Sequence, residues 1–237
     1  MRKSAYFLLI LCLVFATLTC SKKINQSGLK PPKVAMIPTA ADTSRSERGI
    51  DAVPERDAIR IEWFPGSDER VIQYEIYRRT EAVGAKFVKI TAIAEPDSFY
   101  EDVVPLVGVR YFYTVLAVND EDLRSESGDT LNYLLLQKAV NLQPTGIQSN
   151  TKPVFTWSDP NQAHEYVIRL LENASNRVIW ISVVQADYGN QVQSVKFNSD
   201  QKAAYPALIS GFEYRWRVDV RGNAGGSESK WATLRIQ

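Results

Sequence analysis

The sequence predicts an all-β protein built from two tandem β-sandwiches, and two observations carry this prediction. Short apolar runs such as Ile59–Trp63 and Tyr111–Val118 alternate with polar residues and end at turn residues, which is the period of half-buried strands. The second half of the chain repeats the pattern of the first, and a repeat of about 100 residues indicates two copies of one domain. We expect one domain over residues 33–136 and a second over 137–237.

The N-terminal segment has the pattern of a secretory signal. Arg2 and Lys3 precede the uncharged apolar run Ala5–Ala16. This run is shorter than the roughly 20 residues that cross a bilayer, and a charged start before a short apolar stretch is typical of a signal peptide. The sequence therefore predicts a signal peptide over residues 1–19, with an uncleaved anchor helix as the alternative.

Cys20 follows this segment directly and is a candidate lipid attachment point. The stretch Ala16–Cys20 resembles a bacterial lipobox, whose cysteine receives diacylglycerol, although Thr17 and Thr19 depart from the preferred Leu and small residue. The other cysteine, Cys12, lies within the signal and would leave with it. The resemblance implies a lipoprotein held to a membrane through Cys20, and a soluble secreted or periplasmic protein is the alternative.

The residues after the signal predict a tether and a location in the cell envelope. Residues 20–32 are polar, contain one Gly and two Pro, and have no apolar period, so they predict a flexible tether. Ser21, Lys22 and Lys23 follow the cysteine without an acidic retention signal, which favours the periplasmic face of the outer membrane. The formal net charge is +1 without a basic stripe, so nucleic acid is not an expected partner.

The repeated residues are two strand-ending tryptophans and the tyrosines that follow them. Trp63 and Trp157 each end an alternating run, and Tyr74 and Tyr166 each open the next one. Further along each copy, a Leu and a Gly precede a tyrosine that begins a long alternating strand, which is followed by a Ser-rich strand. These segments are Leu106–Tyr111 with Ser125–Ser127 in the first copy, and Leu208–Tyr214 with Ser227–Ser229 in the second.

Together these residues resemble fibronectin type III domains, closely in the first copy and less closely in the second. The resemblance implies two immunoglobulin-like sandwiches with the tryptophans between their sheets. It also implies a tyrosine corner at Tyr111 and at Tyr214, where the hydroxyl bonds to nearby backbone. Residues 189–206 of the second copy match no expected strand.

The chain offers little that predicts catalysis. His164 is its single histidine, and the sequence has no G-x-S-x-G nucleophile motif and no His or Cys that would complete a zinc site with it. Asp120–Asp122 lacks the spacing of an EF-hand calcium loop and is better explained as a hairpin turn. We therefore predict no catalytic residue, no metal site, no cofactor and no enzymatic activity.

Two surface patches are candidate binding sites. In the second copy, strand alternation points Arg215 and Arg217 outward beside Trp231 of the next strand. A cation–π contact there either stiffens the sheet or forms part of a ligand surface. In the first copy, Phe112 and Leu116 point outward near Tyr77, which together form an apolar face that something should cover.

The second copy is the expected cover for that face, because the link around Leu136–Ala139 is short, and a partner protein is the alternative. The predicted function is a non-catalytic, lipid-anchored envelope protein that uses its sandwiches for protein or glycan binding or as a spacer. One alternative is a carbohydrate-binding accessory protein using Trp180, Tyr188 and Trp231; another is a soluble secreted fibronectin type III protein.

Overall fold

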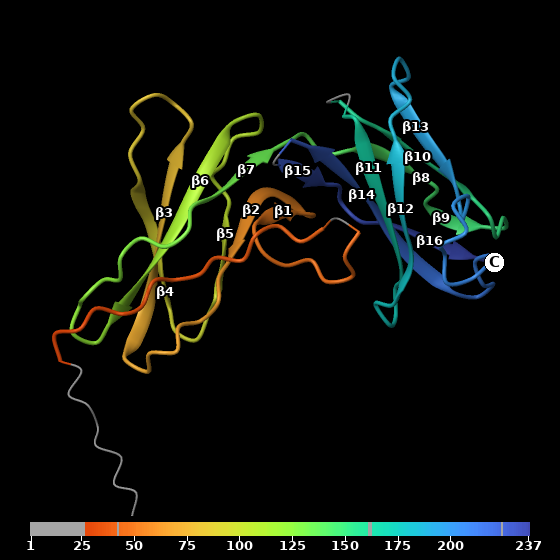
Figure 1. Cartoon of the computed structure of the whole chain (residues 1–237). Coiled ribbons are helices and arrows are strands. Elements are labelled where there is room, and N and C mark those ends of the chain that lie inside the picture. Colours follow the sequence, from red (N-terminus) through yellow and green to blue (C-terminus); the bar gives the residue numbers. More distant parts are fainter. Residues whose placement is uncertain (1–26, 42, 161–162, 224) are drawn as a thin grey trace, which may run out of the picture.

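The computed structural model describes residues 27–41, 43–160, 163–223 and 225–237, and its regular elements are β-strands (Figure 1). The predicted signal peptide, residues 1–19, and Cys20 lie outside the described residues. Within these ranges, no helix has the length and apolar character needed to cross a membrane. The predicted all-β class is confirmed.

The first sandwich consists of a three-stranded and a four-stranded layer. The smaller sheet has the order β1-β2-β5, and the larger one runs β7-β6-β3-β4, with antiparallel neighbours throughout. The strands are β1 (Asp51–Val53), β2 (Arg56–Glu62), β3 (Val71–Thr80), β4 (Val88–Ala94), β5 (Phe99–Asp102), β6 (Arg110–Asn119) and β7 (Leu131–Leu135).

The second sandwich repeats this arrangement. Its smaller sheet is β13-β10-β8, and its larger layer is β12-β11-β14, where β14 pairs with both β15 and β16 and β9 runs parallel to β16. The strands are β8 (Val140–Gln143), β9 (Gly146–Gln148), β10 (Val154–Ser158), β11 (Glu165–Glu172), β12 (Val178–Gln185), β13 (Val192–Lys196), β14 (Glu213–Gly222), β15 (Gly225–Glu228) and β16 (Ala232–Ile236). Both halves are fibronectin type III-like sandwiches, and the unassigned stretch after residue 189 contains β13.

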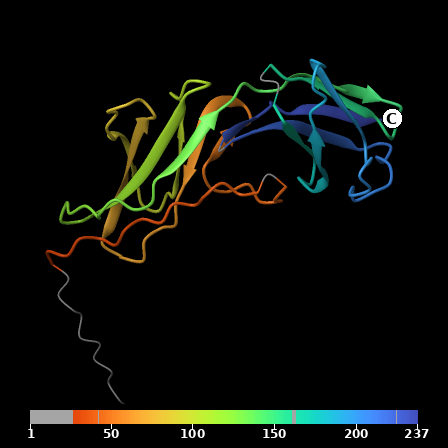
Figure 2. The same cartoon turned by 45° about the horizontal axis from the view of Figure 1, so that its top comes forward.

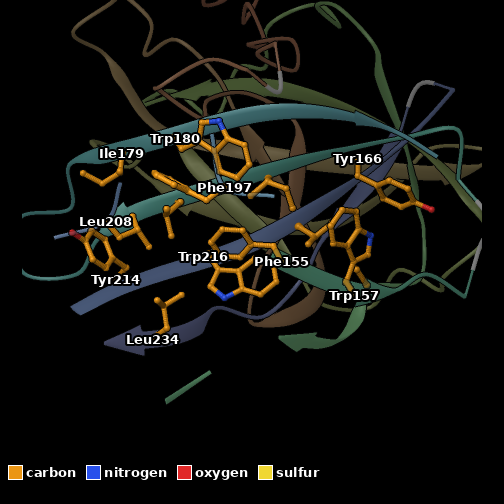
Figure 3. Close-up of a cluster of buried hydrophobic side chains, with 14 of the residues drawn as sticks. Phe155, Trp157, Tyr166, Ile179, Trp180, Phe197, Leu208, Tyr214, Trp216 and Leu234 are labelled. Atoms are coloured by element: carbon orange, nitrogen blue, oxygen red, sulfur yellow. The ribbon is translucent and has the colours of Figure 1, made fainter. Parts of the chain in front are cut away.

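Each sandwich has its own aromatic core. Trp63 packs on Tyr74 with ring centroids 5.3 Å apart, and Trp157 packs edge-on against Tyr166 at 5.2 Å. Figure 3 shows the second core, in which Phe155 and other rings fill the space between the layers. Because large aromatic side chains bury much apolar area, these clusters supply a large part of the stabilisation.

Trp180 belongs to this second core and corrects the expectation of a surface ring. It is 1% exposed, its ring lies 5.4 Å from that of Phe197, and its indole N–H donates to the Asp200 carboxylate at 2.8 Å. The reason is strand pairing: β12 lies beside β11, and Trp180 is registered with the core residue Leu170. Trp180 therefore faces the interior and is removed from the candidate binding residues.

The two predicted tyrosine corners are present. The Leu106 amide donates to the Tyr111 hydroxyl at 3.2 Å, and the Ile209 amide donates to the Tyr214 hydroxyl at 3.0 Å. Both tyrosines are buried, so each hydroxyl satisfies a backbone group that the turn leaves without a strand partner. The same side-chain hydrogen bond thus stabilises the turn before the long strand in each copy.

The larger layers of the two sandwiches join into one ten-stranded sheet. Strand β15 pairs in parallel with β7, so that Gly225 is registered with Leu134. The chain crosses between the sandwiches through Leu136–Ala139, beside this pairing. Figures 1 and 2 both show the two sandwiches side by side along this shared sheet, with the C-terminus at the far end of the second.

Residues of the predicted tether, before the predicted start of the first domain at residue 33, contact the first sandwich. The Gly28 amide donates to the Glu121 carboxylate at 2.8 Å, and Lys30 pairs with Glu126 at 2.6 Å. The last part of the predicted tether therefore lies against the first sandwich, at the end remote from the second (Figure 1).

Candidate functional site

The predicted aromatic–cation patch of the second sandwich is present. The guanidinium carbons of Arg215 and Arg217 lie 4.7 and 4.9 Å from the ring centroid of Trp231. Strand pairing explains the contact, because Trp231 immediately precedes β16, which pairs with β14. Arg215 and Trp231 are each half-buried, so part of this patch remains open.

Arg217 is buried rather than exposed, which corrects its place on an open binding surface. Only 2% of its surface is accessible. Its Nε donates to Asp219 at 2.7 Å, and its Nη2 pairs with Glu228 and with Glu47. Glu47 comes from the loop of the first sandwich that precedes β1, and this loop contacts Arg217 on β14 and Arg169 on β11. Strand alternation predicted the outward direction but not the covering loop.

The candidate face of the first sandwich is covered by its own charged side chains. Phe112 is half-buried beneath Arg79, whose guanidinium carbon lies 3.9 Å from the ring centroid. Tyr77, also half-buried, donates its hydroxyl to Glu75 at 2.9 Å, and Leu116 is registered with Glu75 on β3.

Glu75 is the central charge on that face. Its carboxylate accepts from Arg124 at 2.9 Å and from Lys89 at 3.2 Å. The hydrogen bonds from Arg124 lead in lowering the pKa of Glu75 to about 2, against a smaller opposing effect of burial. The expectation that the second sandwich covers this face is wrong, because the second sandwich adjoins the edge strand β7 instead.

The junction between the sandwiches contains an ion-pair network. Arg169 and Arg217 lie directly opposite each other on β11 and β14. Glu47 pairs with both, at 2.7 Å between its Oε1 and the Nε of Arg169. Arg169 also donates to the Ser44 carbonyl at 2.9 Å, so the loop of the first sandwich is held at two points.

A lysine in the linker clamps the same junction. Lys138 donates to the Val53 carbonyl of the first sandwich and to the Glu228 carbonyl of the second, both at 2.7 Å. Burial leads in lowering its pKa. Beside it, the Tyr133 hydroxyl donates to Asp51 at 2.9 Å. A cavity of 280 Å³ at the junction is lined by residues of both sandwiches, so the two halves meet through polar as well as backbone contacts.

Three carboxylates of the junction lie close enough to consider as metal ligands. One oxygen from each of Glu47, Asp219 and Glu228 lies within 4.8 Å of the others. However, Arg217 pairs with all three, and Arg169 adds a second positive charge. Burial leads in raising the pKa of Glu47 and raises that of Glu228 strongly. The three acids therefore serve as hydrogen-bonding partners of Arg217, and Glu47 carries this pairing across the junction.

A second cavity lies at the loop end of the second sandwich and was not predicted from the sequence. This loop-end pocket has a volume of 490 Å³ and is formed by the start of β8, by Asp159, Pro160 and Ala163 between β10 and β11, and by the loop between β12 and β13. Tyr188 stands at its rim, 65% exposed, and its hydroxyl contacts Nδ1 of His164. His164 itself is exposed and lies just before β11.

Comparison with known proteins gives distant similarities. No family model matches the chain. An amylopullulanase from Thermoanaerobacter thermohydrosulfuricus is 22% identical over 187 residues, which is 69% of this chain and 13% of the enzyme. The chain thus spans about an eighth of that relative's length.

Two solved structures are similar in part. A β-1,2-glucanase from Parabacteroides distasonis matches with a TM-score of 0.34 and 22% identity, covering 47% of this chain and 13% of that one. The chicken CNTN1 FN1-FN3 domains match with a TM-score of 0.34 and 15% identity, covering 87% of this chain and 67% of that one.

Proposed function

We propose that this protein is a non-catalytic, lipid-anchored component of the cell envelope that holds two β-sandwiches as one rigid unit for binding. The observation that carries the proposal is the junction, where a shared sheet, the linker residue Lys138 and the Glu47 ion pairs act together. Tandem domains joined by a flexible linker reorient freely, whereas backbone pairing and buried ion pairs fix their relative position.

The position of the N-terminal segment supports a function in presentation. The segment that starts at residue 27, red in Figure 2, lies at the end of the first sandwich that is remote from the second. With a lipid on Cys20, the intervening residues reach at most about 28 Å when fully extended. The first sandwich then stays near the membrane and the second extends away from it, which suits contact with a partner in the envelope. We place the anchor in the outer membrane on its periplasmic face.

A carbohydrate-binding accessory role is the second candidate. The similar relative is named amylopullulanase, a name that denotes action on polysaccharide. The similarity covers 69% of this chain but only a small fraction of that protein. This pattern supports a glycan rather than a protein as the partner. An envelope protein as partner remains the alternative within the same binding role, and so does a soluble secreted form without the lipid.

Metabolic labelling with palmitate tests the anchor. The wild-type protein should carry the label and sediment with membranes, whereas Cys20→Ser should lose the label and appear in the soluble fraction. Cys12→Ser is the matched control, because Cys12 would leave with the signal, and it should behave as wild type. Label that persists in Cys20→Ser, or wild-type protein without label, contradicts the anchored form.

A further inference from the structure

We propose that the loop-end pocket of the second sandwich is a binding site for a neutral saccharide. This deepens the proposed binding role by naming a site and a ligand class. Its volume of 490 Å³ falls within the range of small-molecule sites. It lies between loops at one end of a rigid sandwich, where a fixed scaffold presents side chains to a ligand.

The lining of the pocket favours hydroxyl groups. Asp159 and Asp187 supply carboxylate oxygens that accept hydrogen bonds, and Asn141, Asn190 and Gln191 supply amides that both donate and accept. A sugar carries adjacent hydroxyls, each a donor and an acceptor, and therefore matches such a mixture. No lysine or arginine lines the pocket among the described residues, so an anionic ligand would meet two carboxylates without a compensating cation.

The rim supplies the apolar surface that a sugar ring also needs. Tyr188 is 65% exposed, and its ring meets that of His164 at 66° with centroids 5.7 Å apart. An aromatic face carries negative charge and attracts the weakly positive C–H groups of a sugar ring. Inside the pocket, Ala163 and Ala186 provide small apolar patches. Alternating polar and apolar contacts of this kind suit a pyranose, which has polar edges and apolar faces.

The loop that carries Tyr188 is held in place before any ligand arrives. Gln193, 4% exposed on β13, donates to the Asp187 carbonyl at 3.1 Å and to the Asn190 carbonyl at 2.6 Å, and it accepts from the Asp187 amide at 2.8 Å. The Asn190 amide group also donates to the Asp187 carboxylate at 2.6 Å. A preorganised loop loses less conformational entropy on binding.

The opposite wall is held in the same way. The Tyr166 hydroxyl and the Ala163 amide both donate to Asp159 Oδ2, at 2.9 and 2.6 Å. Tyr166 packs on the core tryptophan Trp157, so this wall is tied directly to the interior of the sandwich. Both walls therefore belong to the rigid part of the domain.

Isothermal titration of the soluble protein lacking residues 1–20 with neutral hexasaccharides tests the proposal, using maltohexaose, cellohexaose, laminarihexaose and mannohexaose. We expect at least one to bind, with affinity reduced about tenfold or more by Tyr188→Ala and by a smaller factor by Tyr188→Phe. Phe212→Ala is the matched control, because this exposed ring lies at the opposite end of the sandwich. Phe212 precedes the start of β14, which pairs with the end of β11 at Glu172, whereas the pocket adjoins the start of β11. Its affinity should equal that of wild type.

Three results would overturn the proposal. They are no binding of any of the four sugars at millimolar concentration, binding that Tyr188→Ala leaves unchanged, and tighter binding of hexagalacturonate or of a lysine-rich peptide than of every neutral sugar. The last two would indicate another site or a charged ligand. None of these results alters palmitate labelling at Cys20, so the site and the anchored, rigid pair can fail independently.

Discussion

Arg169 and Arg217 lie directly opposite each other on neighbouring strands of the second sandwich, and Glu47 of the first sandwich pairs with both. Like charges in opposed positions of a sheet destabilise it. The second sandwich supplies Glu228 to Arg217 and Asp219 to both arginines, at 2.7 Å from Arg217 and 3.8 Å from Arg169, and Glu47 adds a second bridging carboxylate from the other half of the chain. The electrostatic balance of the second sandwich thus depends in part on the position of the first.

Removing Arg217 should destabilise the protein strongly. Arg217→Met leaves Asp219 and Glu228 buried without their main counter-charge, and breaking a buried pair in this way costs about 3–5 kcal/mol. Arg215→Met is the matched control on the same strand, where loss of the half-buried contact with Trp231 should cost about 0.5–1 kcal/mol. Urea unfolding followed by tryptophan fluorescence measures both; equal losses would contradict the burial argument.

Should Arg217→Met fail to fold, Arg217→Lys gives the same test. Lysine keeps the charge but provides no planar fork for several carboxylates. Arg217→Lys should therefore be less stable than the wild type and less stable than Arg215→Met. It should still fold under conditions in which Arg217→Met does not. A lysine variant as stable as wild type would show that the geometry of the guanidinium is unimportant.

The junction should become less stable as the pH rises. Burial, followed by the nearby carboxylate of Asp219, raises the pKa of Glu228 well above its usual value. Glu228 then binds a proton more tightly in the folded state than in the unfolded state. Its contribution to the free energy of unfolding is therefore full below the pKa of the unfolded state, and it is lost as the pH rises through the pKa of the folded state. Glu228→Gln should flatten the fall in unfolding free energy above the ordinary glutamate pKa of 4.5. An unchanged slope would contradict the prediction.

Glu75 should give the opposite dependence. Hydrogen bonds from Arg124 lead in lowering its folded pKa to about 2 from an ordinary value of 4.5. Its stabilisation is therefore present above pH 4.5 and is lost as pH falls towards 2. Acid unfolding followed by circular dichroism should show a weaker loss of stability in Glu75→Gln than in wild type over this window. A steeper loss in the variant would reverse the assigned sign.

The tyrosine corners should contribute equally in the two copies. Tyr111→Phe and Tyr214→Phe each keep the buried ring but leave one backbone amide, of Leu106 or Ile209, without its acceptor. Loss of one hydrogen bond of this kind costs about 0.5–1.5 kcal/mol. Denaturant unfolding of both variants measures the loss. A neutral result in either would show that water replaces the hydroxyl in that turn.

The sequence predicted what local periodicity controls and missed what depends on distant loops. Alternation along single strands identified the core positions of Trp63 and Trp157 and the Trp231–Arg215 contact, but it did not identify the core position of Trp180. The burial of Arg217 depends on Glu47, which lies in a loop without periodic pattern. The loop-end pocket likewise draws on separate loops, and only the richness in Asp, Asn, Gly and Tyr between Asp187 and Asn190 could have drawn attention to it.

The shared sheet itself can be tested at a single glycine. A Cβ at Gly225 would lie 2.2 Å from the Leu134 carbonyl oxygen, so Gly225→Ala cannot keep the pairing of β15 with β7. Gly66→Ala is the matched control, because its Cβ would meet its nearest neighbour, the Tyr74 hydroxyl, at an ordinary 3.7 Å. Because each sandwich keeps its own core, the alanine at 225 should loosen the junction more than it unfolds either half.

Distance measurements separate the two effects. Spin labels on cysteines introduced at the exposed Val83 of the first sandwich and Val183 of the second report the spacing of the halves. We expect a broader distribution of distances in Gly225→Ala than in wild type or Gly66→Ala, together with faster amide exchange in β7 and β15. The junction would then retain only side-chain contacts such as the Glu47–Arg169 pair, which salt screens when they become exposed. The distance distribution of Gly225→Ala should therefore broaden further as the ionic strength rises. A distribution in Gly225→Ala as narrow as that of the wild type would mean that the ion pairs alone fix the two sandwiches.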